Sequence, residues 1–355
     1  MTDPLKEIRD KIDALDERLV GLLNERARLA QTIGHMKKQG SAYRPEREAQ
    51  VLRRVRELNE GPLSGDAVSH LYTEIMSACL ALETPITVAY LGPRGTFSEE
   101  AVVKHFGAAA IGLPCGSIDE TFHSVESGAA NYGVVPVENS TEGAVGRTND
   151  LLFKNPVLIC GEVMLPVHQC LMNSSGRADG FTKIYSHSQS LAQCQGWLNS
   201  HYQKVERIAV VSNPEAARLA AQEDSAAAIA GRIAAERYAL KIVASNIEDE
   251  QRNITRFVVI GNDDAGPSGQ DRTSLVMSTR NRPGAINELL VPFAQHGVSM
   301  SRLESRPARS GLWEYLFFVD IEGHKQDENV VKALAEVDAK ATFVKILGSY
   351  PRAVD

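Results

Sequence analysis

Residues 5–36 read LKEIRDKIDALDERLVGLLNERARLAQTIGHM, and this segment governs the first part of the chain. Its apolar residues recur at steps of three and four, at Leu5, Ile8, Ile12, Leu15, Leu19, Leu22, Leu29, Ile33 and Met36. That spacing predicts one long helix whose apolar stripe packs along its length against partner helices. Arg26 stands between Leu22 and Leu29, where the stripe should be apolar.

Arg26 needs an anion, because a guanidinium stays charged and is costly to bury unpaired. The anion is either a buried carboxylate of this protein, with Arg26 then fixing helix register, or a ligand. Arg9 and Lys37 flank the same seam and favour a ligand. Arg9 lies roughly 26 Å from Arg26 along the helix axis. A small ligand that binds Arg26 can therefore also contact an Arg9 only if an antiparallel partner chain supplies it.

Helical patterning continues to about residue 85, with no sign of a strand. A second helix begins at Pro45, a favoured first-turn residue, and carries Arg47 and Glu48. A third helix spans about residues 66–83 and carries Cys79 and Glu83 near its end.

Composition and charge restrict the class of protein. A chain of 355 residues predicts two or three domains. A net charge of −7 argues against general binding to nucleic acid or to a membrane surface. No apolar run has transmembrane length, and the polar N-terminus predicts no signal peptide. Five cysteines without metal-ligand spacing predict reduced thiols in a cytoplasmic protein with no metal site.

Strand and helix patterns alternate over residues 86–262, which predicts an α/β domain. The expected strands are 86–91, 132–137, 157–159, 183–186, 207–211, 226–230 and 257–260. Residues 262–271 (NDDAGPSGQD) are a linker by composition. Residues 273–351 then follow the order βαββαβ of a ferredoxin-like unit, with strands at 273–279, 298–305, 313–321 and 342–347 and helices at 283–296 and 327–336.

Two turns of the middle domain are candidate ligand sites. Residues 92–98 (GPRGTFS) could bind an anion before a helix, although a plain strand-to-helix turn explains them equally well. In residues 134–143 (VVPVENSTEG) a strand ends in proline, and hydrogen-bonding side chains follow it. Open α/β sheets bind ligands at such strand ends. The alternative for this second segment is a capped loop.

Residues 253–257 (NITRF) come just before an apolar strand and combine an amide, a hydroxyl and a cation. That combination suits a carboxylate substrate. Ser186, His187 and Gln193 flank the end of another strand, where a lone histidine is more often structural than catalytic.

In this order, these motifs together with Glu304-Ser305-Arg306-Pro307 resemble the bifunctional chorismate mutase/prephenate dehydratases, the P-protein family of phenylalanine biosynthesis. The resemblance covers nearly the whole chain. It implies an all-α chorismate mutase domain of the AroQ type at 1–85, which forms a helical dimer. It further implies a two-lobed α/β prephenate dehydratase domain like type II periplasmic binding proteins at 86–262, and an α+β ACT regulatory domain at 273–351.

The resemblance also implies the residues that bind chorismate. They are Arg9 from the partner subunit, Arg26, Lys37, Arg44, Arg47, Glu48, Cys79 and Glu83, of which Arg26, Lys37, Glu48 and Glu83 are the catalytic ones. The mutase reaction is a pericyclic rearrangement, so the site must hold the dianion folded and stabilise charge on the ether oxygen.

Three mutase positions depart from other family members. Some members carry Gln where Glu83 stands, Ser where Cys79 stands, and an acidic residue where Arg44 stands. A carboxyl group can donate a hydrogen bond to the ether oxygen only when it is protonated. We therefore expect mutase activity that declines as the pH rises through neutrality.

The resemblance assigns the essential dehydratase hydroxyl to Thr255. The other residues implied to bind prephenate are Glu138, Asn139, Ser140, Ser186, Gln193, Asn253, Arg256 and Phe257. The proton for the departing ring hydroxyl could come from Glu138, His187 or a water.

In the ACT unit, phenylalanine is implied to bind Gly284, Ala285, Ile286 and Asn287 together with Glu304, Ser305, Arg306 and Pro307. A plain helix start and strand end would also fit these residues. No cofactor is expected.

Two other functions fit part of the pattern. A non-catalytic amino-acid sensor could use a two-lobed binding domain and an ACT unit, but it would not need both sets of site residues. A monofunctional dehydratase could use its helical domain only to dimerise.

Overall fold

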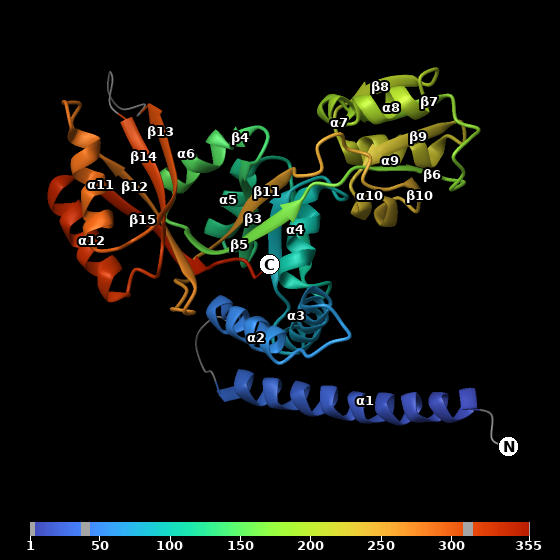
Figure 1. Ribbon diagram of the computed structural model, residues 1–355, viewed down its shortest axis with the longest axis horizontal. Coiled ribbons are helices and arrows are strands. Elements are labelled where there is room, and N and C mark those ends of the chain that lie inside the picture. Colours follow the sequence, from blue (N-terminus) through green and yellow to red (C-terminus); the bar gives the residue numbers. More distant parts are fainter. Residues whose placement is uncertain (1–3, 37–42, 308–314, 355) are drawn as a thin grey trace.

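The computed structural model describes residues 4–36, 43–307 and 315–354 (Figure 1). A helical part, a two-lobed α/β part and a four-stranded sheet with two helices follow one another along the chain. The helical part and the four-stranded sheet both pack against the first lobe, whereas the second lobe lies away from them (Figure 1). The three architectures expected from the sequence are confirmed.

The helical part consists of α1 (Pro4–Met36), α2 (Pro45–Glu57) and α3 (Gly65–Ala81). Helix α1 runs beneath α2 and α3 and contacts α3, and none of its residues is buried (Figure 1). The apolar stripe is therefore open to solvent within one chain: Leu15 is 58% exposed and Leu29 is 60% exposed. A continuous apolar face of this length requires a partner surface.

Helices α2 and α3 are bound to the first lobe by polar contacts. The hydroxyl of Tyr43 lies 2.6 Å from Nε2 of His105, and the backbone N–H of Ala109 donates to Ser77 at 3.3 Å. Arg53 donates to the backbone oxygen of Ser268 at 2.9 Å. The segment expected to be a linker is thus packed, and Ser268 is only 7% exposed.

The first lobe is a six-stranded sheet in the order β2-β1-β3-β11-β5, with β4 paired to the end of β3. Strand β11 enters from the second lobe and pairs antiparallel with both β3 and β5. The strands are β1 (Thr87–Leu91), β2 (Ile111–Cys115), β3 (Tyr132–Asn139), β4 (Gly143–Ala144), β5 (Leu158–Pro166) and β11 (Ile254–Gly261). The helices are α4 (Phe97–Phe106), α5 (Ile118–Glu126) and α6 (Gly146–Lys154).

The second lobe is a five-stranded sheet in the order β10-β6-β9-β7-β8. The chain enters it after β5 and leaves it after β10, so two segments join the lobes. The strands are β6 (Cys170–Asn173), β7 (Lys183–His187), β8 (Glu206–Val210), β9 (Ala226–Ala230) and β10 (Lys241–Ala244). The helices are α7 (Ser188–Gln193), α8 (Gln195–His201), α9 (Asn213–Gln222) and α10 (Arg232–Arg237).

Several strand predictions need correction. The strands β2, β4, β6 and β10 were not expected, because each has at most five residues and too little alternation to show in the sequence. Strand β3 continues past Pro136 to Asn139, and β11 begins at Ile254 rather than at Phe257. The register of β3 and β11 shifts opposite Pro136, and a β-bulge is where a strand tolerates proline. Residues 254–257 therefore lie inside a strand, not before it.

The C-terminal unit has the expected βαββαβ order and the sheet order β13-β14-β12-β15. Its elements are β12 (Asp271–Ser278), α11 (Ala285–Gln295), β13 (Met300–Pro307), β14 (Tyr315–Glu322), α12 (Glu328–Lys340) and β15 (Phe343–Pro351). The expected start of β14 at residue 313 falls outside the described residues. Helices α11 and α12 cover one face of the sheet, and the other face shares a core with the first lobe.

Phe318 lies in that shared core and is 3% exposed, whereas Phe343 of the same sheet is 40% exposed. We expect Phe318→Ala to lower the free energy of unfolding by roughly 3–5 kcal/mol, through lost burial and a cavity. Phe343→Ala should cost clearly less, because much of its side chain already contacts water. Urea unfolding of both variants measures the difference, and equal losses would contradict a core between sheet and lobe.

Candidate functional site

Arg26, the cation in the apolar stripe, joins α1 to α3. Its Nη1 donates to Sγ of Cys79 at 3.1 Å, and Cys79 is buried. Among the described residues, the hydrogen bond of Arg26 thus goes to a thiol and not to a carboxylate. This geometry leaves the charge of Arg26 available to an anion, which favours the ligand interpretation over a structural ion pair.

One of the two expected mutase glutamates, Glu48, interacts with this cation. Burial raises the pKa of Glu48, on α2, to about 8, although the charge of Arg26 acts to lower it. Glu83 follows α3, and its Oε2 would lie 2.6 Å from a Cβ placed on Gly34 of α1. Glycine at position 34 therefore lets the Glu83 carboxylate approach α1. Helices α1, α2 and α3 thus bring Arg26, Glu48 and Cys79 together. Glu83 lies beside Gly34, roughly two helical turns from Arg26 along α1.

The remaining expected mutase residues are more exposed. Arg44 precedes α2 and pairs with Glu46 at 3.6 Å, and Arg47 is exposed on α2. Arg9 is exposed on α1, far along the helix from Arg26. Lys37 lies outside the described residues.

Thr255 and Asn139 form the polar centre of the first lobe. Nδ2 of Asn139 donates to Oγ1 of Thr255 at 2.9 Å and to Oδ1 of Asn253 at 2.7 Å. Oδ1 of Asn139 accepts from the N–H of Thr141 and of Glu142 at 3.0 and 3.1 Å, which fixes the amide. Because Thr255 accepts this hydrogen bond, its own hydroxyl proton is left to donate to another group.

This pairing follows from the sheet register, in which Thr255 lies directly opposite Asn139. Ser140 supports the pair from the adjoining turn: its Oγ accepts from the N–H of Ile254 at 2.9 Å and donates to the carbonyl of Arg252 at 3.2 Å. Phe257, in contrast, is buried in the lobe core at 2% exposure, so it supports the strand rather than lining a site.

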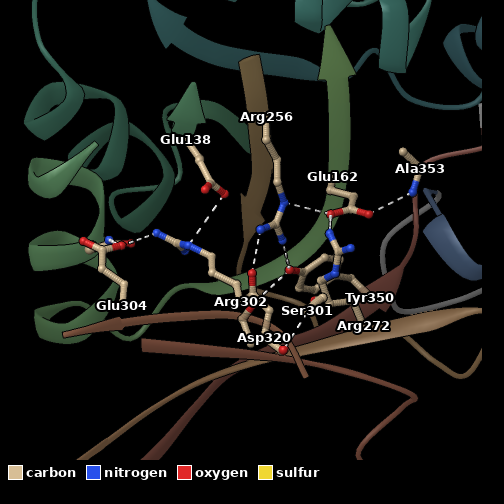
Figure 2. A network of polar contacts seen from close by, with 12 residues as sticks. Glu138, Glu162, Arg256, Arg272, Ser301, Arg302, Glu304, Asp320, Tyr350 and Ala353 are labelled. Carbon is tan, nitrogen blue, oxygen red and sulfur yellow. Dashed lines mark hydrogen bonds and ion pairs between the residues drawn. The ribbon is translucent and has the colours of Figure 1, made fainter. Parts of the chain in front are cut away.

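Arg256 is not brought together with Thr255. Successive side chains of a strand point to opposite faces, and the guanidinium of Arg256 contacts Glu162, Asp320 and Tyr350 (Figure 2). Glu138 is paired with Arg256 in the register and lies 3.7 Å from Arg302 of β13. These positions correct the expectation that both residues lie beside Asn139 and Thr255. It arose because the first strand was expected to end before Glu138 and the second to begin after Arg256.

Ser186 and Gln193 lie in the second lobe. Ser186 is fully buried, and its Oγ donates to the carbonyl of Ile229 at 2.8 Å. Its hydroxyl is thus committed to the protein. Oε1 of Gln193 accepts from Gln169 at 3.2 Å.

Sequence reasoning missed three polar residues that surround Ser186 and Gln193. Asn213 donates to Ser190 at 2.9 Å and accepts from the N–H of His187 at 3.1 Å, and Gln169 donates to Ser190 at 3.2 Å. Asn213 follows the end of β8, and a polar residue just after a strand is the sequence signal that could have identified it.

Two side-chain contacts join the lobes. Glu142 of the first lobe accepts a hydrogen bond from Gln189 of the second. Arg237 of α10 pairs with Glu99 of α4 at 2.8 Å. Glu99 also accepts from the N–H of Gly95, so that group of the 92–98 segment is occupied by the protein. This occupancy favours the strand-to-helix turn over an anion site.

In the C-terminal unit, Gly284 has a φ of +80° and precedes α11, whose first turn contains Ala285, Ile286 and Asn287. In the second expected segment, residues 304–307 of β13, successive side chains point to opposite faces of the sheet. Glu304 accepts from Asn149 of α6 at 2.9 Å, and Arg306 pairs with Asp150 at 3.3 Å. Ser305 and Pro307 are exposed on the other face of β13. Glu304 and Arg306 therefore contact the first lobe.

No helix within the described ranges is long and apolar enough to span a bilayer. The described residues also contain no group of three or more His, Cys, Asp or Glu residues arranged to hold a metal ion.

Three family models match successive parts of the chain: chorismate mutase type II at residues 8–84, prephenate dehydratase at 88–265 and the ACT domain at 273–339. A bifunctional chorismate mutase/prephenate dehydratase of Neisseria gonorrhoeae is 53% identical over 98% of this chain and 96% of its own length.

Two solved structures resemble about three quarters of the chain. Prephenate dehydratase from Arthrobacter aurescens in complex with L-Phe has a TM-score of 0.69 and 33% identity, over 76% of this chain and 90% of its own. GqqA, described as a novel type of quorum quenching acylase, has a TM-score of 0.70 and 28% identity, over 75% and 98%.

A helical cluster around a cation, a two-lobed domain with a threonine–asparagine pair and a ferredoxin-like unit define a multidomain enzyme with two separate reaction sites. The chain belongs to the bifunctional chorismate mutase/prephenate dehydratase family. The match to both enzyme families argues against a non-catalytic amino-acid sensor and against a monofunctional dehydratase whose helical domain only dimerises.

Glu48 gives the mutase site an expected pH dependence. Below about pH 8 its carboxyl is protonated and can donate a hydrogen bond to chorismate. Above that pH it becomes an anion beside a substrate dianion. We expect the KM for chorismate to rise roughly tenfold between pH 7 and pH 9, and Glu48→Gln to flatten the rise.

Glu83→Gln is the matched control, since Glu83 is the other carboxyl expected in the mutase site. A profile flattened by Glu83→Gln and unchanged by Glu48→Gln would assign the pH dependence to Glu83, as the sequence alone suggested. A KM that is flat in the unmodified enzyme would contradict both.

Proposed function

We propose that the chain converts chorismate to prephenate in residues 1–85 and prephenate to phenylpyruvate in residues 86–262, with residues 273–351 as the regulatory domain. The two reactions supply L-phenylalanine biosynthesis. The observation that carries the proposal is the Asn139–Thr255 hydrogen bond in one part of a chain that also holds the Arg26 cluster in another.

The mutase reaction needs no nucleophile, because one C–O bond breaks as one C–C bond forms within chorismate. Arg26 and Arg47 bind the carboxylates, together with Arg9 of a second copy of the chain. Glu48 donates to the ring hydroxyl, and Lys37 and Glu83 donate to the ether oxygen as it gains negative charge. Cys79 supports Arg26, with which it shares a hydrogen bond, and Arg44 lies at the rim.

The dehydratase reaction releases carbon dioxide and the ring hydroxyl as water, and the electrons of the broken C–C bond complete the aromatic ring. Thr255 donates its free hydroxyl proton in a hydrogen bond to the departing hydroxyl, and Asn139 holds Thr255 in place. A threonine hydroxyl is too weak an acid to give up its proton. The proton therefore comes from His187 or a water, since Glu138 lies on the other face of β3.

L-Phenylalanine is the proposed regulator. The relative from Arthrobacter aurescens, which was solved with L-Phe, supports this ligand. Gly284 to Asn287 and the exposed Ser305 and Pro307 would contact it, and Glu304 and Arg306 would link the bound segment to the first lobe. Inhibition then requires that L-phenylalanine binds one arrangement of the domains more tightly than another.

A homodimer built on α1 is part of the proposal. Its support is the exposed stripe of α1, whose large apolar residues are all at least half exposed in one chain. Two antiparallel copies of α1 would cover both stripes and bring Arg9 of each chain to Arg26 of the other. A cytoplasmic location is supported by five free cysteines, all buried.

The two reactions should be separable by substitution. From chorismate, the unmodified enzyme should form phenylpyruvate, and L-phenylalanine should suppress it. Thr255→Ala should slow the dehydratase at least roughly a hundredfold while chorismate is consumed at the normal rate, so prephenate accumulates. Arg26→Ala should abolish chorismate loss and leave added prephenate a substrate.

Thr255→Ser is the control, because it keeps the hydroxyl and should retain much of the dehydratase rate. Full dehydratase activity in Thr255→Ala would refute the assignment of Thr255. Loss of both activities in Arg26→Ala, with unchanged melting temperature, would refute independent sites.

Sharing of mutase sites predicts complementation between two inactive variants. Arg9→Ala and Arg26→Ala should each be inactive as homodimers. Refolded together, half of the dimers are mixed, and each mixed dimer has one site with both arginines intact. Mutase activity should thus return to about a quarter of normal. No recovery, with mixed dimers demonstrated by mass spectrometry, would mean that each chain builds its own site.

A further inference from the structure

We propose that Arg256 and Asp320 form a positioning pair through which the C-terminal sheet sets the geometry of Asn139 and Thr255. This inference rests on the proposed role of Thr255. Arg256 points away from the Thr255 face of β11 and binds Asp320 there, so the two residues act on the dehydratase reaction through the strand that carries Thr255.

The position of Arg256 is the first step of the argument. It follows Thr255 in β11 and points to the opposite face, toward the C-terminal sheet (Figure 2). Arg256 is only 6% exposed, and its guanidinium donates in three directions. It donates to Glu162 at 3.0 Å, to Asp320 at 2.5 Å and to the hydroxyl of Tyr350 at 2.8 Å. A residue next to Thr255 is therefore held mainly by strands β14 and β15.

Asp320 is the second step. It is fixed within its own sheet, because Oδ1 accepts from Ser274 at 2.5 Å, and Ser274 lies 2.6 Å from the hydroxyl of Tyr350. Although burial opposes ionisation, the charges of Arg256 and Arg302 hold the pKa of Asp320 below its usual value. A buried charged pair with fixed hydrogen bonds has a narrow set of allowed geometries. Movement of β14 is therefore transmitted to β11.

A second contact links the C-terminal sheet, through β13, to the Asn139–Thr255 pair. Glu138 precedes Asn139 and lies opposite Arg256, and it faces Arg302 at 3.7 Å. Arg302 also pairs with Glu304, a residue of the segment that carries the proposed regulatory site (Figure 2). Both members of the Asn139–Thr255 pair thus have a neighbour in the chain whose side chain is bound to the C-terminal sheet.

The test uses the full chain and the near-isosteric change Asp320→Asn, with Arg256→Lys as a second variant that keeps the positive charge. We expect kcat of the dehydratase to fall roughly ten- to hundredfold, because small misplacements of a reacting group cost that much. The KM for prephenate should change less than about twofold, and the mutase rate from chorismate should stay normal as an internal measure of folded enzyme. The midpoint of L-phenylalanine inhibition should shift as well.

Glu322→Gln is the matched control, since Glu322 lies on the same strand and pairs with Arg352 rather than with Arg256. It should change none of these quantities. The decisive measurement combines Asp320→Asn with Thr255→Ala. If Asp320 acts through Thr255, its substitution should have little further effect on the residual rate. A full additional loss in the Thr255→Ala background would overturn the proposal, and so would an unchanged kcat in both single variants.

Failure of this inference can be told apart from failure of the proposed function. If Thr255→Ala alone leaves the dehydratase fully active, the assignment of Thr255 is wrong, and the inference is overturned with it. If Thr255→Ala is inactive while Asp320→Asn and Arg256→Lys behave like the unmodified enzyme, the proposed function stands and only the positioning pair is refuted.

Discussion

The side-chain alternation of β11 is the constraint on which the dehydratase part depends. This strand returns from the second lobe, pairs with β3 and β5, and is shared by two functions. One face presents Thr255 to Asn139, and the other presents Arg256 to the C-terminal sheet. Since the two side chains leave adjacent residues of one pleated strand, a shift of the strand backbone displaces both.

The charged network beside β11 explains how the sheet is attached to the first lobe. Two cations, Arg256 and Arg272, face two carboxylates, Glu162 and Asp320, and the backbone N–H of Ala353 completes the hydrogen bonds of Glu162 (Figure 2). Apolar contacts around Phe318 surround it. The apolar core holds the two layers together, whereas the charges fix how they are aligned, because ion pairs are directional and hydrophobic burial is not.

The helical part has a different requirement. None of the described residues of its longest helix is fully buried within one chain, and that helix keeps a cation, Arg26, within an apolar stripe. Such a helix is stable only when its apolar face is covered, and the same covering surface would enclose the cation and Glu48. In this part of the protein, the stability of α1 and the formation of the site around Arg26 thus depend on the same covering surface.

Much of this protein was determined by local sequence patterns. The spacing from Leu5 to Met36, the strand patterns and the βαββαβ order predicted three architectures, because helix and strand periods are properties of the local chain. Arg26, Glu48, Cys79 and Glu83 were predicted in one site; the structure places the first three near one another and Glu83 beside Gly34. The packing of Ser268 and the short strands β2 and β6 were not visible, since they depend on distant partners.

Only the tertiary structure decided which way the residues around Thr255 point. The sequence placed Glu138 and Arg256 with Asn139 and Thr255, because all four are neighbours in two polar motifs. A strand, however, sends neighbouring side chains to opposite faces, and the extent of β3 and β11 depends on pairing across more than a hundred residues. In the same way, the hydroxyl of Ser186 is hydrogen-bonded to the carbonyl of Ile229 and to Oδ1 of Asn213, and no local pattern reveals these partners. Residue types are local information, whereas the face that a side chain occupies is set by non-local pairing.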